Sequence, residues 1–130
     1  MTDGTDLPSS LLELSLIEAS SPFYILVDAS LRIAKVGRSL RKLFGPALVL
    51  PVPLGDVFRV VHPDVAMELA PLLRLEGKAI TLECLSLRAV MRASLVRVPG
   101  GAGFLLLANP WITSREDLAR LGLVPEDFAP

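Results

Sequence analysis

Side chains that could carry out chemistry are few and scattered in this sequence. His62 is the only histidine and Cys84 the only cysteine, and no matching partner accompanies either of them. A serine or cysteine nucleophile needs a base beside it, and a metal ion needs several ligands. The sequence therefore predicts a protein that is not an enzyme and that holds no metal.

For each of these two residues one functional role stands beside a structural one. His62 could be an axial ligand to heme, but it stands directly before Pro63 and a predicted helix, a position that favours a turn. Cys84 falls on a predicted strand, where a free cysteine behaves mostly as a small hydrophobic residue. We interpret both as structural, with heme ligation by His62 and redox sensing by Cys84 as the alternatives.

The composition indicates one small domain with apolar surface to spare. The chain has 130 residues, of which 52% are hydrophobic, and its mean hydropathy is +0.54. A net charge of −1 provides no positive field for nucleic acid. No stretch approaches the ~18 consecutive apolar residues of a membrane helix, and the acidic start MTDGTD is unlike a signal peptide. We expect a cytoplasmic protein that buries its surplus apolar surface against a partner.

The first half of the chain alternates between turn signals and short hydrophobic segments. Residues 1–8 are interpreted as a leader, and Ser10 with Glu13 forms a capping-box pattern for a short N-terminal helix. FYILVD and LRIAKVG are predicted strands joined by the turn-forming DAS, and RSLRKLF has helical spacing. The proline-rich GPALVLPVPL is expected to be a loop, and GDVFRVV either a helical turn or a strand.

The second half predicts a helix followed by three strands. In HPDVAMELAPLLRLEG, Asp64 is the expected N-cap, and Pro71 should kink or end the helix. Between Lys78 and Ala108 the apolar alternation changes phase once, which predicts a bulge or turn near residues 84–89. VPGGAG is typical of a hairpin turn.

The closing segment leads from a strand into a helix. Thr113 with Glu116 should cap this helix, and Gly122 should end it. The sole tryptophan, Trp111, stands between the strand and the helix. At such a place a tryptophan either plugs the core or anchors a partner, and both interpretations stay open.

Basic residues supply one further candidate surface. Arg38, Arg41 and Lys42 lie on one face of the predicted helix RSLRKLF. Most charged faces of this kind are simply solvated, and contact with an acidic partner is the alternative.

The order of two strands, short helices and three strands is that of a PAS fold. The segments SPFYILVDASLRIAKVGRSLRKLF, GDVFRVVHP, MRASLVRVP and FLLLANPWITSREDLARLGLVPEDFAP also resemble successive blocks of the heme-NO-binding-associated domain. The resemblance covers about residues 21–130 and is most specific in the final segment. This PAS-like module follows the heme domain in soluble guanylate cyclases and in bacterial signalling proteins such as sensor histidine kinases.

The resemblance implies a non-enzymatic regulatory module that binds no heme or other cofactor itself. Such a module dimerises, as a homodimer or heterodimer, and relays a signal from a heme-based gas sensor to an output domain such as a kinase or cyclase. Two alternatives stay open. One is a PAS domain that senses heme or a hydrophobic metabolite in a pocket between the sheet and the helices at 38–44 and 65–73. The other is a stand-alone adaptor for a separate heme sensor protein.

The predicted fold is therefore α+β and PAS-like, with an antiparallel sheet of about five strands, short helices on one face and a helix at each end. Three parts are expected: a leader with a flanking helix at 1–20, a PAS-like core at 21–112 and a connector helix at 113–130. The predicted interface residues lie on the flanking helices and at the ends of the sheet: Leu12, Leu16, Ile17, Phe23, Trp111 and Leu118.

Overall fold

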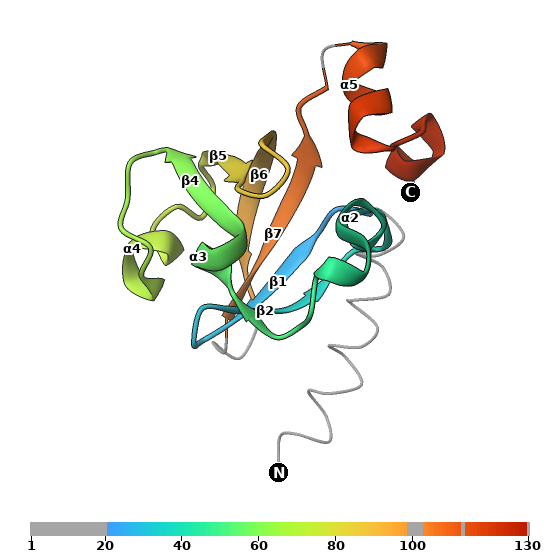
Figure 1. Cartoon of the computed structure of the whole chain (residues 1–130). Coiled ribbons are helices and arrows are strands. Elements are labelled where there is room, and N and C mark those ends of the chain that lie inside the picture. The colour runs from blue at the N-terminus through green and yellow to red at the C-terminus, as the bar shows by residue number, and fades with distance from the viewer. Residues whose placement is uncertain (1–20, 99–102, 113, 130) are drawn as a thin grey trace.

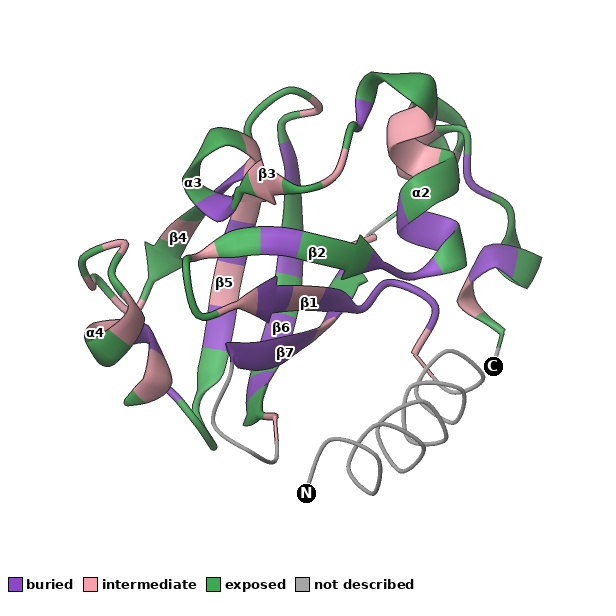
Figure 2. Cartoon of the chain, turned by 90° about the horizontal axis from the view of Figure 1, so that it is seen from below, coloured by how far each residue is buried: buried purple, intermediate pink, exposed green. Residues whose placement is uncertain are grey.

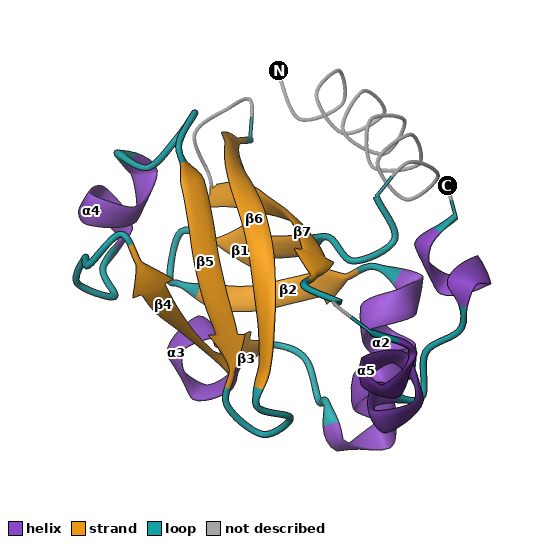
Figure 3. Cartoon of the chain, turned by 90° about the horizontal axis from the view of Figure 1, so that it is seen from above, coloured by secondary structure: helices purple, strands orange, loops and turns teal. Residues whose placement is uncertain are grey.

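A computed structural model describes residues 21–98, 103–112 and 114–129. The predicted leader and N-terminal helix, the centre of VPGGAG, and Thr113 lie outside these residues. Within them, one antiparallel sheet holds seven strands in the order β3-β2-β1-β7-β6-β5-β4 (Figure 1). The sheet is strongly curled, so that β1 and β2 run across the direction of β5 and β6 (Figure 3). The fold class is α+β, as predicted.

The elements are short and follow one another closely. The strands are β1 (Ile25–Asp28), β2 (Arg32–Val36), β3 (Val52–Pro53), β4 (Phe58–His62), β5 (Ala79–Cys84), β6 (Ala89–Arg97) and β7 (Gly103–Pro110). The helices are α2 (Arg38–Phe44), α3 (Leu54–Val57), α4 (Leu69–Leu73) and α5 (Arg115–Leu121), with 3-10 turns η1 (Gly45–Ala47) and η2 (Pro125–Phe128).

The predicted hairpin of β1 and β2 is confirmed, and one carboxylate shapes its turn. Asp28 Oδ1 accepts hydrogen bonds from the backbone N–H groups of Ser30 and Arg32, at 2.9 and 3.0 Å. Such a side-chain bond replaces a backbone turn bond, which is why aspartate favours turns. The two strands then pair antiparallel, with Ile25 opposite Val36.

The sheet has two more strands than the five or so that were predicted. GPALVLPVPL is not a loop throughout, because Val52–Pro53 forms the edge strand β3 against β2. A proline is tolerated there because an edge strand leaves one side unpaired. GDVFRVV was expected to be either a helical turn or a strand, and it contains both, since α3 ends at Val57 and β4 begins at Phe58.

Helix α4 begins later than predicted. Asp64 is not its N-cap; Glu68 holds that position, and the helix runs from Leu69 to Leu73. Pro71 explains the shift, because a proline deep inside a helix clashes with the carbonyl four residues before it. Placed in the first turn, Pro71 does not break the helix, since the N–H groups of that turn have no partner within the helix.

The predicted change of phase between β5 and β6 is confirmed as a tight turn. The strands pair with Cys84 opposite Ala89, and Arg88 in the turn adopts a φ of 51°. The inward positions are therefore even-numbered on β5 and odd-numbered on β6, as their alternating burial shows (Figure 2).

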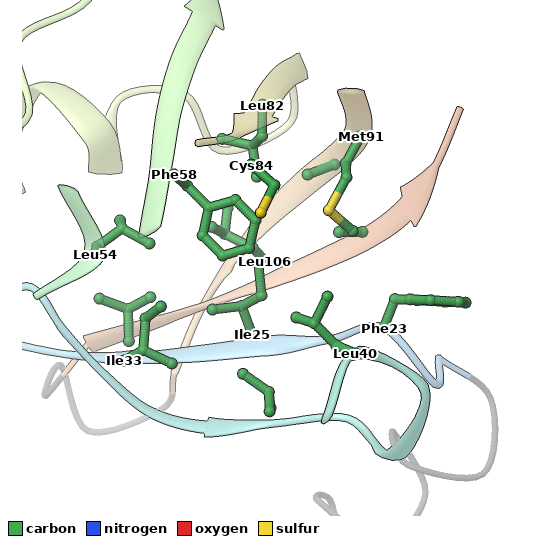
Figure 4. Packing of buried hydrophobic residues seen from close by; sticks show 14 of the residues in the cluster. Phe23, Ile25, Ile33, Leu40, Leu54, Phe58, Leu82, Cys84, Met91 and Leu106 are labelled. Carbon is green, nitrogen blue, oxygen red and sulfur yellow. The ribbon is translucent and has the colours of Figure 1, made fainter. Parts of the chain in front are cut away.

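One apolar core lies on the concave face of the sheet. Leu40 of α2, Leu54 of α3 and Leu72 of α4 all belong to it, so these helices cover the same face. From the strands come Ile25, Ile33, Phe58, Leu82, Met91 and Leu106, several of which converge around the ring of Phe58 (Figure 4).

Candidate functional site

The space between the sheet and the short helices is filled by side chains. Phe58 is 1% exposed and Leu40 fully buried, and the Phe58 ring meets Phe44 edge to face with centroids 6.1 Å apart. The pocket proposed between the sheet and the helices at 38–44 and 65–73 is therefore occupied by the protein's own core (Figure 4). An open hollow of about 330 Å³ beside α3 is lined mainly by apolar side chains, including Val49 and Val57.

His62 and Cys84 lie apart. His62 is exposed at the end of the edge strand β4, whereas Cys84 is 1% exposed in the core, with its Sγ 3.8 Å from Ser86 Oγ. Within the described residues no group of three or more histidine, cysteine or acidic side chains is positioned to hold a metal ion. The position of Cys84 fits the interpretation as a small core residue.

The outer face of the sheet offers a different surface. Leu26 of β1 lies opposite Leu105 of β7, which in turn lies opposite Val96 of β6, so the three side chains form a row across the outer face. Val96 is 41% exposed, and Val90, on the same face of β6, is 36% exposed. Apolar side chains thus reach solvent on β6, whereas Leu105 on β7 is only 7% exposed.

Trp111 follows the end of β7 beside Val90, farther along the outer face than this row, and Arg92 and Asn109 lie between them. Its side chain is 51% exposed, which excludes the interpretation as a core plug. The Arg92 guanidinium lies 4.4 Å from the centre of the Trp111 ring. The backbone N–H of Trp111 donates to Val90 O at 2.8 Å. A cation over the face of an indole ring is attracted by the ring's electrons and fixes its orientation. We call Leu26, Val90, Val96, Leu105 and Trp111 the outer-face patch.

The outer-face patch stops at β5, where charges replace the apolar side chains. Arg59 of β4 and Glu83 of β5 form an ion pair with Nη2 and Oε1 2.6 Å apart. This exposed ion pair adds little stability, but it marks the polar margin of the outer-face patch.

A second assembly joins the C-terminal residues to α2. Lys42 Nζ donates to Asp127 Oδ2 at 2.8 Å, Ser39 Oγ donates to the Asp127 carbonyl, and Arg38 donates to the Ala129 carbonyl. The Phe128 ring packs on Phe23 with centroids 5.0 Å apart. Two of the three residues of the predicted basic face, Arg38 and Lys42, therefore meet acidic and carbonyl groups of their own chain.

Asp127 is the most perturbed group of this assembly. The hydrogen bond from Lys42 holds the pKa of the Asp127 carboxyl below its ordinary value, opposed by burial and assisted by the Val124 N–H and by the charges of Lys42 and Arg38. Its side chain is only 10% exposed, so the negative charge is kept by these donors and not by water.

Helix α5 approaches this assembly with local signals at both ends. Ser114 is the N-cap, and its Oγ accepts from the Asp117 N–H at 3.2 Å. The prediction of Thr113 with Glu116 placed this cap one residue too early, because the serine that follows the threonine supplies the oxygen. Gly122 ends the helix with a φ of 70°, as predicted.

The six predicted interface residues have different surroundings. Leu12, Leu16 and Ile17 lie outside the described residues. Trp111 belongs to the outer-face patch, and Leu118 is half-buried beside an open apolar hollow of about 320 Å³. Phe23 is fully buried within its own chain, so its role at an interface stays a prediction for a state in which the C-terminal residues have moved.

Sequence reasoning missed four residues that the structure brings together. No functional role was predicted for Arg92 from the sequence, and only its position opposite Asn109 places it over Trp111. Ser39 meets Asp127, and Phe128 meets Phe23, each pair across more than eighty positions of sequence. The sole available signal was complementary charge, with a basic RSLRKLF and an acidic PEDF.

The fold and its surfaces define an α+β domain whose interior is closed and whose outer face is partly apolar. Residues 11–95, more than half of the chain, match the family model described as heme NO binding associated. The chain belongs to this family, whose members are regulatory domains associated with heme-NO sensor signalling. No curated protein matches the sequence. No helix among the described residues is long and apolar enough to cross a membrane.

Proposed function

We propose that this domain is a non-enzymatic dimerisation and relay module. In this role two copies, or one copy and a related domain, associate through the outer-face patch and the N-terminal flanking residues. A change in that packing then passes to whatever domain is attached. The observation that carries the proposal is the exposed Trp111, with exposed Val90 and Val96 on the same outer face, in a domain of a signalling family.

The outer-face patch has the chemistry of an interface centre. Tryptophan and arginine are enriched at interfaces, and tryptophan is among the residues that dominate binding energy. Trp111 lies beside Val90 and against the Arg92 guanidinium. Further apolar area on the same face comes from Leu26, Leu105 and Val96. Arg92 on the indole ring gives Trp111 a fixed orientation before any partner arrives, which lowers the entropy cost of binding.

The order of the central strands supports the PAS-like part of the proposal. Without the edge strands β3 and β4, the sheet reads β2-β1-β7-β6-β5. Renumbered along the chain, this is 2-1-5-4-3, with two strands before the helices and three after them, as the sequence comparison with PAS domains led us to expect. In this view β3 and β4 are additions to a five-stranded PAS-like core at 21–112, with the flanking parts 1–20 and 113–130 at its two ends.

The partners proposed for the domain follow from its family. A heme-based NO or oxygen sensor would act upstream, either in the same protein or as a separate protein for which this domain is an adaptor. A kinase or cyclase would act downstream, and the location would be the cytoplasm. His62 is not part of the proposal, because an exposed side chain on an edge strand does not face the core.

Analytical sedimentation at micromolar concentration tests the dimer. We expect the wild-type chain to sediment as a dimer or as a monomer–dimer mixture, and Trp111→Ala or Val96→Glu to sediment as a monomer. A buried aromatic anchor of this kind typically contributes at least about 2 kcal/mol to binding. Its loss should therefore weaken the dimer by more than tenfold.

Val49→Glu provides the matched control. Val49 is a valine that is 73% exposed in the loop before β3, apart from the outer face, so a charge there should leave the dimer unchanged. A wild-type chain that stays monomeric throughout this range would overturn the proposed dimer, and equal effects of Val49→Glu and Val96→Glu would overturn its location.

A further inference from the structure

Residues 123–129, called the strap from here on, are joined to α5 by the bond from Leu123 N to Leu118 O and docked on α2 by side-chain bonds. The docking bonds run from Ser39 and Lys42 to Asp127, and from Arg38 to the Ala129 carbonyl. The strap adds two apolar contacts, with Phe128 on Phe23 and Leu123 in the core. These contacts are few compared with those that hold the sheet together. The strap can therefore open while the sheet stays folded.

Helix α5, which carries the strap, is built to keep its shape by itself. None of its residues is fully buried, although Leu118 and Leu121 pack against the core at its margin. At its C-terminal end Leu123 N donates to Leu118 O at 2.9 Å and Gly122 N donates to Ala119 O at 3.1 Å. This pair of bonds satisfies the last carbonyls of a helix locally. The end of α5 is therefore stable whether or not the strap is docked.

The region between α5 and the strap is not tightly packed. An apolar hollow of about 320 Å³ is lined by Ile112 before the helix, Leu118 on it, and Pro125 and Phe128 in the strap. In Figure 1 α5 stands away from the sheet and the chain returns from it toward α2. The C-terminal part is thus an arch fixed at the end of β7 and at α2. One further hydrogen bond runs from Arg120 Nη1 of α5 to Leu87 O at 3.3 Å, and undocking breaks it.

We propose that the strap is a releasable clasp, which docks on α2 and Phe23 in one state and undocks together with α5 in another while the sheet stays folded. Undocking uncovers Phe23 and Ser39, both nearly inaccessible in the docked state. The C-terminal residues therefore have a docked and an undocked state.

The docking site is coupled to the sheet through the start of α2. Gly37 N donates to Tyr24 O at 2.9 Å, and Ser39 N donates to Pro22 O at 3.1 Å. A Cβ atom at Gly37 would lie 2.1 Å from the Pro22 carbonyl oxygen, so the lead into β1 and the first turn of α2 are in direct contact. A shift of β1 caused by a partner on the outer face therefore reaches Ser39 and the strap. This coupling rests on the proposed function, whereas opening of the strap does not.

Amide hydrogen exchange on the full chain at neutral pH tests the opening. The strap amides to follow are Val124, which donates to Asp127 Oδ2, and Asp127 and Ala129, which donate to strap carbonyls. We expect them to exchange at least tenfold faster than amides in the β6–β7 ladder. Lys42→Met should accelerate them about tenfold further and leave β6 and β7 unchanged.

Matched variants separate the clasp from general loss of charge. Arg41→Met removes a basic side chain of the same helix that has no charged partner among the described residues, and it should not change strap exchange. Phe128→Ala should open the strap by removing the aromatic contact, which keeps the test valid if Lys42→Met folds poorly. Strap amides as slow as those of the β6–β7 ladder would overturn the proposal, as would equal effects of Lys42→Met and Arg41→Met.

Protein concentration supplies the last arm of the experiment. Strap exchange that becomes slower as concentration rises would mean that a second copy holds the strap, which overturns docking within one chain. A chain that stays monomeric and yet opens its strap would overturn the proposed dimer alone.

Discussion

The two faces of the curled sheet differ in what they leave exposed. On the concave face, Phe58 and Leu40 fill the space under the helices with side chains that are almost inaccessible. On the outer face, Val90, Val96 and Trp111 are each more than a third exposed. A closed interior serves stability, so the surface available for recognition is the outer one. This difference favours contact between proteins over binding of a small ligand in the core.

The inward face was predictable from the sequence because strand periodicity is a local property. The alternation of β5 and β6, and the phase change between Cys84 and Ala89, are visible in residue order alone. The edge strand β3 was not predictable, since two residues that include Pro53 form a strand only because β2 lies beside them. The delayed start of α4 was missed because Pro71 was expected to kink or end a helix and was not placed in its first turn.

The candidate sites were less predictable than the fold. Trp111 could be located in sequence, but whether it fills the core or reaches solvent depends on the path of the chain after Pro110. Lys42 and Asp127 are 85 positions apart, and nothing local indicates that they meet. Residue types thus identified the candidates, whereas long-range packing decided their partners.

The largest effect is expected from the closed face. Phe58→Ala removes a ring that is 1% exposed and packs against Phe44, and it should lower the free energy of unfolding by about 3–5 kcal/mol. Urea denaturation followed by circular dichroism measures this loss. Val61→Ala, on the same strand but 46% exposed, is the control and should cost far less. Similar losses for both variants would contradict the assignment of β4's inward side.

The next effect concerns how α2 is fixed on the concave face. In Gly37→Ala the new Cβ would lie 2.1 Å from the Pro22 carbonyl oxygen, and the resulting displacement should cost about 2–3 kcal/mol. Gly55→Ala is the control, because its Cβ would meet only Met67 Cγ at 3.5 Å. Thermal unfolding of the two variants compares them directly. Equal stability would mean that α2 is not held by this close contact.

A smaller effect should depend on pH. The pKa of Asp127 is lower in the folded chain, chiefly because of the hydrogen bond from Lys42. Its ionised form therefore stabilises the fold above about pH 4, and this contribution is lost as the pH falls through the folded pKa. Asp127→Asn should be less stable than wild type by about 1 kcal/mol at pH 7, with a difference that shrinks in acid.

Urea unfolding across a pH series measures this linkage. Glu126→Gln, at an exposed neighbouring position, should follow the wild-type curve near neutral pH. A difference between wild type and Asp127→Asn that stays constant down to acid pH would contradict the role assigned to the carboxylate.

The central claim is that the outer face of this domain is an interface with Trp111 in it, and the intrinsic fluorescence of the protein tests it directly. Trp111 is the only tryptophan and is 51% exposed in a single chain, so burial in a dimer should move its emission to shorter wavelength. We predict this blue shift over the same concentration range in which sedimentation detects the dimer. A dimer that forms with no change in the emission of Trp111 would contradict the claim.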